Sequence, residues 1–273
     1  MITFEKIQFN LRQIFAIAEK EFKKTLRFKF KLIMEYINPL ISMIFPLIIM
    51  GKFFAFQSNF GPWNQQTYLI YIFVGYNIIS LQKIIGRIGA NFIEEKYWFT
   101  LQALLIAPFN RLNLLLGLVL VHLIEMSIPF VIFLVILYIF FPINIITIMV
   151  VVLMFFALLI IFSGIGFLLG AFHISKESIA KAISTLLNLL FTFSCISFPY
   201  QIFPDWIQSF IFLNPIYYLI DIIRLIWLEN NFIFTIISHP NHFYIFIIGL
   251  IILPIFGIYI FNKVFRRYGI IGY

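Results

Sequence analysis

The chain has 273 residues, of which 63% are hydrophobic and only 11% are charged, whereas a soluble domain has about 45 to 50% apolar and about 25% charged residues. With 37 Phe, 13 Tyr and a mean hydropathy of +1.04, it has too few polar side chains to cover a water-facing surface. This composition excludes a soluble single-domain protein and indicates an integral membrane protein. The single cysteine, Cys195, excludes a disulfide within the chain.

The N-terminal segment 1–31 carries much of the net charge of +8, with eight Lys and Arg against three Glu. Its apolar residues recur at helical spacing between the charges, which is typical of a helix lying in the membrane interface. Nucleic acid is the alternative partner for a basic segment, but the amphipathic pattern favours the membrane surface. The first long apolar run begins only near Ile33, so this segment is not expected to be a signal peptide.

Membrane-spanning helices need roughly 20 apolar residues each, and six stretches meet this requirement. They are 33–56, 68–85, 112–141, 143–172, 179–198 and 243–261. No repeat or linker divides the chain, so we expect one all-α membrane domain over 1–273.

A further apolar stretch, 207–228, is interrupted by polar residues, and the distribution of positive charge decides how to interpret it. With six spans and both termini in the cytoplasm, only Lys52 and Arg224 among the 19 Lys and Arg lie toward the outside. A seventh span would send Lys263, Arg266 and Arg267 outside, against the positive-inside rule. We therefore predict that 203–228 forms a re-entrant or interfacial helix pair on the outer face, broken at Pro215.

The segment 91–111, between the second and third spans, is both charged and amphipathic. It reads NFIEEKYWFTLQALLIAPFNR. We expect a short cytoplasmic helix that starts near Glu94 and Glu95, where negative charge suits the helix dipole, and ends at Pro108. Its apolar stripe, which includes Trp98, fits two interpretations: a helix on the lipid headgroups or a helix that docks a soluble partner.

This segment resembles the corresponding loop of the ABC-2 type transporter permeases, E-E-x-x-x-G-T-L-E-x-L-L-x-A-P-x-x-R. The matching residues are Glu94, Glu95, Thr100, Leu101, Leu104, Leu105, Ala107, Pro108 and Arg111. Phe99 and Gln102 depart from the pattern. The resemblance continues through SGIGFLLGAF, where Gly166 and Gly170 indicate close helix packing, and then through a P-x-W…N-P-x-x-Y-x-x-D-x-x-R block. The residues of that block are Pro204, Trp206, Asn214, Pro215, Tyr218, Asp221 and Arg224.

The resemblance implies the permease subunit of an ATP-driven exporter in the plasma membrane. Such a subunit pairs with a second permease copy, identical or different, and with ABC ATP-binding subunits that bind MgATP. This chain has no G-x-x-x-x-G-K-[ST] loop, so we expect it to bind no cofactor itself. We assign coupling to the ATPase to Glu94, Glu95, Trp98, Thr100, Leu101, Pro108 and Arg111, and an outer gate to the seven residues of the last block. The apolar composition suits an amphipathic drug, a lipid or a lipid-linked glycan as cargo.

Charged residues within an apolar span are candidate functional residues because an unpaired charge there is costly. Glu125 lies in the third span with His122 one turn before it, so the two can share a hydrogen bond. Packing between helices and contact with substrate or protons both remain open for this pair. Asp221 and Arg224, also one turn apart, predict a structural ion pair.

An intramembrane enzyme is the alternative class of function. The H-E-x-x-H motif of zinc proteases is absent, and in the E-E-x-x-x-R pattern of glutamate-type membrane proteases Phe99 stands at the arginine position. The E-A-A-x-x-x-G pattern of importer-type ABC permeases is also absent, which favours export.

Overall fold

The computed structural model describes residues 2–56, 59–98 and 110–270, and these are almost entirely helical. In chain order the helices are α1 (Ile2–Arg27), α2 (Lys29–Ser42), α3 (Ile44–Phe56), α4 (Tyr68–Tyr97), α6 (Arg111–Phe140), α7 (Ile145–Ser175), α8 (Glu177–Thr192), α9 (Asp205–Leu213), α10 (Pro215–Glu229), α11 (Phe232–Ser238) and α12 (Pro240–Ile270). A 3-10 turn covers Tyr200–Ile202, and an antiparallel hairpin, β1 (Asn59–Phe60) and β2 (Trp63–Asn64), follows α3.

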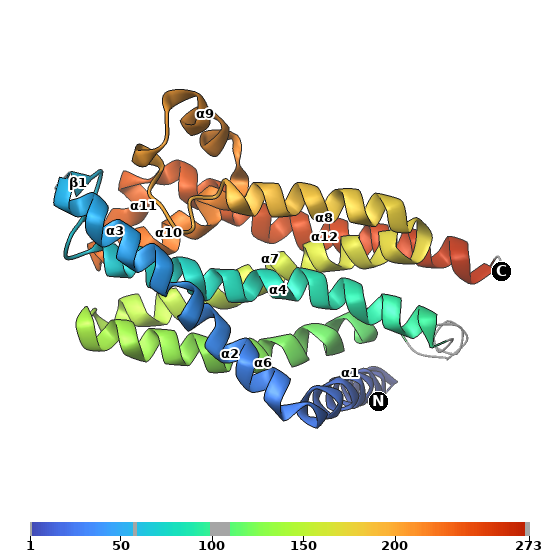
Figure 1. Ribbon diagram of the computed structural model, residues 1–273. Coiled ribbons are helices and arrows are strands. Elements are labelled where there is room, and N and C mark those ends of the chain that lie inside the picture. Colours follow the sequence, from blue (N-terminus) through green and yellow to red (C-terminus); the bar gives the residue numbers. More distant parts are fainter. Residues whose placement is uncertain (1, 57–58, 99–109, 271–273) are drawn as a thin grey trace.

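The long helices lie side by side in one bundle (Figure 1). We call one end of it the α1 end, because α1, the last turn of α4 and the last turns of α12 lie there, and the opposite end the hairpin end, after β1 and β2. The described termini of the chain therefore share one end of the bundle.

Within the described residues, five helical segments are long and apolar enough to cross a membrane. They are Leu32–Ala55, Tyr68–Glu95, Leu112–Phe140, Ile145–Ser175 and Pro240–Val264, and the bent pair α9 and α10 is a sixth candidate. This result confirms the predicted all-α integral membrane architecture. Predicted spans one to four and six fall on these five segments, whereas the number of crossings stays a prediction.

The predicted fifth span, 179–198, extends past the helix that the structure contains. α8 has 16 residues and ends at Thr192, which gives a length of about 24 Å. Beyond it the chain turns, and Cys195 adopts a left-handed conformation with φ of 56°. The carbonyl groups of Cys195 and Ile196 accept hydrogen bonds from Arg224. The guanidinium thus takes the place of the main-chain N–H donors that these carbonyls would have in a longer α8.

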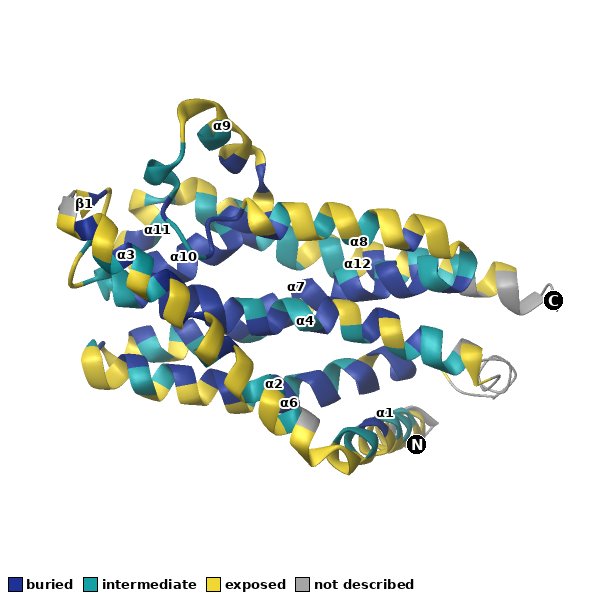
Figure 2. Cartoon of the chain, viewed as in Figure 1, coloured by how far each residue is buried: buried dark blue, intermediate teal, exposed yellow. Residues whose placement is uncertain are grey.

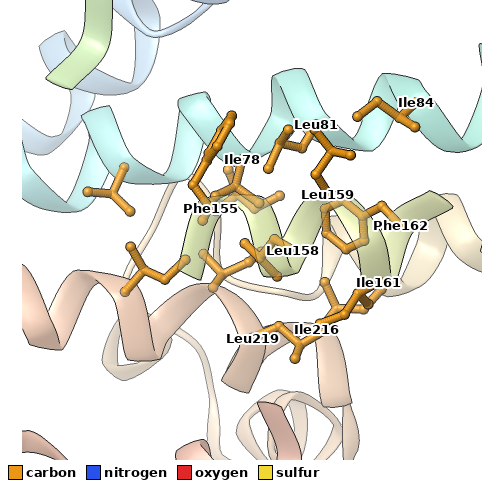
Figure 3. Packing of buried hydrophobic residues seen from close by; sticks show 14 of the residues in the cluster. Ile78, Leu81, Ile84, Phe155, Leu158, Leu159, Ile161, Phe162, Ile216 and Leu219 are labelled. Atoms are coloured by element: carbon orange, nitrogen blue, oxygen red, sulfur yellow. The ribbon is translucent and has the colours of Figure 1, made fainter. Parts of the chain in front are cut away.

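The core of the bundle is built around α7, which lies between α4 and α10 (Figure 3). Leu81 and Ile84 of α4 and Leu219 of α10 face α7, which contributes Leu158 and Phe162 to the contact. All five side chains are at most 2% exposed. Figure 2 shows this buried centre and, around it, helix faces with exposed residues; many of these residues are apolar, as expected of surfaces that contact lipid.

Glycines allow α7 to approach α4 and α12 at backbone distance. A Cβ atom on Gly257 of α12 would lie 2.1 Å from the carbonyl oxygen of Gly164 of α7, and one on Gly170 would lie 2.6 Å from the ring of Phe92 in α4. One on Gly166 would lie 3.0 Å from Ile88. The predicted close packing at Gly166 and Gly170 is therefore confirmed, because both residues face α4.

Candidate functional site

The last turn of α4 carries Glu94 and Glu95, the first pair of the predicted coupling residues. The prediction that a separate helix starts at these glutamates is wrong, since α4 continues to Tyr97. Carboxylates are unfavourable at the C-terminal end of a helix dipole, but α1 supplies the compensating charge: Lys20 forms an ion pair with Glu95 at 2.7 Å, and Lys24 forms one with Glu94.

These contacts determine the charge state of Lys24. Burial lowers the pKa of Lys24, but the hydrogen bond to Glu94 and the charges of Glu21, Glu94 and Glu95 raise it by more, so the pKa lies above its ordinary value. Lys24 therefore stays protonated at physiological pH and available for its ion pair with Glu94.

Tyr97 and Trp98 project from the same end of α4. Their side chains are 67% and 70% exposed, and the Lys24 ammonium group lies 6.0 Å from the Trp98 ring centroid. Of the other predicted coupling residues, Thr100, Leu101 and Pro108 lie outside the described residues. Arg111 begins α6, and its side chain also lies outside the described part of the structure.

A second polar cluster joins α2, α4 and α6. The predicted hydrogen bond between His122 and Glu125 is present, with His122 Nδ1 3.3 Å from Glu125 Oε2. The same carboxylate oxygen accepts a hydrogen bond from Arg87 of α4 at 2.6 Å, and Arg87 also binds Glu35 of α2. Sequence reasoning missed Arg87 and Glu35 as partners of Glu125, because only the rotation of three separate helices brings them together.

At the hairpin end, the predicted break at Pro215 is observed as an 89° bend between α9 and α10. Asn214 caps α10 by accepting a hydrogen bond from the Ile216 N–H, and its side-chain amide donates one to the Leu190 carbonyl at 2.6 Å. The Tyr218 hydroxyl closes the bend by donating to the Phe212 carbonyl at 2.9 Å. These bonds explain the positions of Asn214, Pro215 and Tyr218 in the sequence block.

Two other residues of the block lie at the start of α9. Pro204 precedes its first turn, and Trp206 is 67% exposed. Neither side chain takes part in the hydrogen bonds at the bend, and both are exposed.

Arg224 is completely buried and binds main-chain oxygens on two elements. Its guanidinium donates to the carbonyls of Tyr71 at 3.1 Å, Cys195 at 3.0 Å and Ile196 at 2.7 Å, and it lies 3.6 Å from the Tyr71 ring centroid. The predicted ion pair with Asp221 is present at 3.8 Å, but the carbonyl contacts are shorter. Arg224 thus attaches the turn after α8 to α4.

Asp221 itself is shared between three groups. Its carboxylate accepts a hydrogen bond from the Tyr217 hydroxyl at 3.2 Å and lies 3.4 Å from His242 Nε2 of α12. Together with Arg224 these contacts connect α10 to α12 and to α4, so the hairpin end is held by a continuous polar network.

The bundle has ion-paired helix ends on one side and a capped, bent helix pair on the other. Together with its long apolar helices, this architecture defines the class: a multi-pass membrane protein. The sequence matches the ABC-2 type transporter family over residues 12–228. The chain belongs to this family and is a transport subunit without an ATPase site. The family implies an ABC ATP-binding partner. A search of curated proteins finds no match.

Proposed function

We propose that this chain is the permease subunit of an ATP-driven exporter that moves an amphipathic drug, lipid or lipid-linked glycan across the plasma membrane by alternating access. In this proposal the α1 end faces the cytoplasm, and so do both termini. The concentration of Lys and Arg at that end supports the orientation.

The observation that carries the proposal is the exposed pair Tyr97 and Trp98 at the end of α4. An exposed tryptophan beside charged residues is the kind of side chain that becomes a binding hot spot when a partner covers it. The ion pairs of Lys20 and Lys24 join α1 to this end of α4, so a push on Trp98 by the ATPase would move both helices. We assign coupling to Glu94, Glu95 and Trp98 on these contacts, and to Thr100, Leu101, Pro108 and Arg111 on the family pattern.

A polar stripe on α8 supports the second permease copy. Five exposed residues recur at helical spacing along one face: Ser178, Lys181, Thr185, Asn188 and Thr192. Thr185 and Thr192 donate their hydroxyl groups to main-chain carbonyls of the same helix, and Lys181 is paired with Glu177 at 3.0 Å. The side-chain amide of Asn188, which Gln82 approaches at 3.5 Å, remains costly against lipid. A second permease copy, or a water-filled path between the two copies, would supply hydrogen-bond partners for the polar side chains of this face.

The groove beside the stripe supports the same arrangement. It lies between α4 and α8, where the Gln82 amide approaches Asn188 at 3.5 Å, and it contains hollows of about 310 and 600 Å³. Polar groups and apolar walls in one groove suit an amphipathic cargo.

The coupling role is tested by replacing Trp98 with alanine and measuring how much ATPase subunit copurifies at equal membrane level. We expect Trp98→Ala to weaken docking about 30-fold, which corresponds to a hot-spot loss of about 2 kcal/mol. Trp206→Ala is a matched control, because Trp206 has nearly the same exposure, 67%, at the other end of the bundle. If Trp98→Ala retains its ATPase and its stimulated ATP hydrolysis as well as the control does, the proposed coupling role of this segment is wrong.

A further inference from the structure

A cavity of about 810 Å³ lies between α1, α2, α4 and α6, next to the polar cluster of Arg87 and Glu125. We call it the α1 cavity. It is separate from the groove between α4 and α8. Its wall combines apolar side chains, among them Phe28, Leu32 and Leu118, with the ionised groups of the cluster.

Two polar side chains of this wall are buried and incompletely paired. Glu125 is 1% exposed and His122 is 5% exposed. Glu125 Oε2 accepts from Arg87 and lies beside His122, but among the described residues neither Glu125 Oε1 nor His122 Nε2 has a hydrogen-bond partner. The nearby Thr25 hydroxyl donates to the Glu21 carbonyl instead. A buried polar atom without a hydrogen-bond partner is costly. A ligand in the cavity that bonds to these two atoms would remove that cost.

Both unpaired atoms are acceptors when His122 is neutral and donates Nδ1–H to Glu125. A carboxylate oxygen can only accept hydrogen bonds, and a neutral His122 that donates Nδ1–H to Glu125 has a lone pair and no proton on Nε2. The matching ligand group is therefore one with several N–H or O–H donors.

The local charge favours a cationic donor. Arg87 is shared by two carboxylates, those of Glu35 and Glu125. The neighbouring Lys83 ammonium group donates to the main-chain oxygen of Glu35 at 3.5 Å rather than to a carboxylate. The four other cations that line the cavity are on α1: Lys20, Lys23 and Lys24 are paired with glutamates, and Arg27 is exposed at the rim. Two carboxylates thus share one guanidinium in the deep part of the cavity, so that this group of three side chains carries one net negative charge.

We propose that the α1 cavity binds the protonated amine of an amphipathic molecule. The ammonium group donates to Glu125 Oε1 and His122 Nε2, and the apolar tail lies against Phe28, Leu32 and Leu118. The inference does not depend on export, because it concerns binding to the permease alone. Two sources share this chemistry: the headgroup of phosphatidylethanolamine and a free amphipathic amine.

Native mass spectrometry of the full chain in a non-ionic detergent tests the proposal with dodecylamine as the probe. We expect one dodecylamine molecule per chain, and weaker binding of dodecyltrimethylammonium, which has the same charge but no N–H donor. Glu125→Gln should weaken dodecylamine binding by about tenfold or more, since it removes the charge that strengthens the hydrogen bond. Asp205→Asn, which removes an exposed carboxylate on α9, should leave binding unchanged.

A second variant keeps the test valid if Glu125→Gln fails to fold. Ala90 lines the cavity from an exposed position on α4, so Ala90→Phe should fill the cavity and reduce binding without a change of charge. Ala16→Phe, on an exposed face of α1, is its matched control, and a melting curve shows that each variant is folded.

The lipid arm distinguishes the two sources. Phosphatidylethanolamine that copurifies with the wild type, is lost from Glu125→Gln and is displaced by dodecylamine identifies the lipid as the ligand; dodecylamine binding without retained lipid identifies a free amine. The proposal is overturned if folded Glu125→Gln and Ala90→Phe bind dodecylamine as their controls do, if dodecyltrimethylammonium binds equally well, or if no amine binds and the unpaired atoms are served by water alone.

Discussion

Replacing Arg224 by methionine removes the guanidinium that attaches the turn after α8 to α4, while an unbranched side chain of similar length stays in its place. The substitution deletes three hydrogen bonds to main-chain oxygens and the stacking on Tyr71. It also removes the cation 3.8 Å from Asp221. We expect a less stable hairpin end.

The size of the loss follows from what remains bonded. The Tyr71 carbonyl lies inside α4 and keeps its helical partner, and the Cys195 carbonyl keeps the Tyr71 hydroxyl. The Ile196 carbonyl, in contrast, has Arg224 as its hydrogen-bond donor at 2.7 Å and is left without it. One unsatisfied buried acceptor costs about 1 to 3 kcal/mol, and the lost charge-assisted bonds add to it. We therefore expect a destabilisation of about 3 kcal/mol.

Thermal unfolding of the purified protein, followed by tryptophan fluorescence, measures this loss. A destabilisation of that size should lower the melting temperature by about 5 to 10 °C. Arg266→Met, which removes the same charge from an exposed position on α12, is the control. If Arg224→Met melts at the temperature of Arg266→Met, the buried guanidinium does not stabilise the hairpin end and the reasoning fails.

Two further predictions concern helix contacts. Gly257→Ala should destabilise the protein by about 2 kcal/mol or more, because the new Cβ would lie 2.1 Å from the Gly164 oxygen. Gly249→Ala is the control and should melt like the wild type, because its Cβ would lie 3.5 Å from the nearest atom. Equal melting temperatures of the two variants would contradict the close packing. Lys24→Glu should release α1 from α4 and speed its cleavage by chymotrypsin, and Lys24→Glu combined with Glu94→Lys should restore protection. Because the pKa of Lys24 is raised, its contribution to protection should be present from neutral pH up to its ordinary pKa of about 10.4 and be lost as the pH rises through the raised value. A double variant as sensitive as the single one would refute the ion pair.

The parts of the fold that depend on composition and local pattern were predictable from the sequence. Long apolar runs identified the spanning segments, and Asn214-Pro215 identified the break between α9 and α10, because proline starts a helix readily but cannot continue one. The pairing of His122 with Glu125 was predictable for the same reason: both lie on one helix, one turn apart.

Contacts between distant segments were not predictable in this way. Nothing local in the sequence indicates that Arg87 of α4 reaches Glu125 of α6, or that Lys20 of α1 neutralises Glu95. The prediction of a helix start at Glu94 failed because it placed the acidic residues at the N-terminal end of a helix, where the dipole favours them. They lie at the C-terminal end of α4, where the lysines of α1 compensate for the unfavourable dipole. The end of α8 was missed because its cause, Arg224, lies beyond the helix in the chain.

The continuity of α4 has a mechanical consequence. The helix is unbroken from Tyr71, which is bound to Arg224, to Glu94, which is bound to α1, a distance of about 35 Å at 1.5 Å per residue. A rigid rod of this length that tilts by about 5° about one end displaces the other by about 3 Å, more than the length of a hydrogen bond. α4 can therefore act as a lever, and a small rotation at the α1 end would either carry the turn after α8 with it or break the bonds of Arg224.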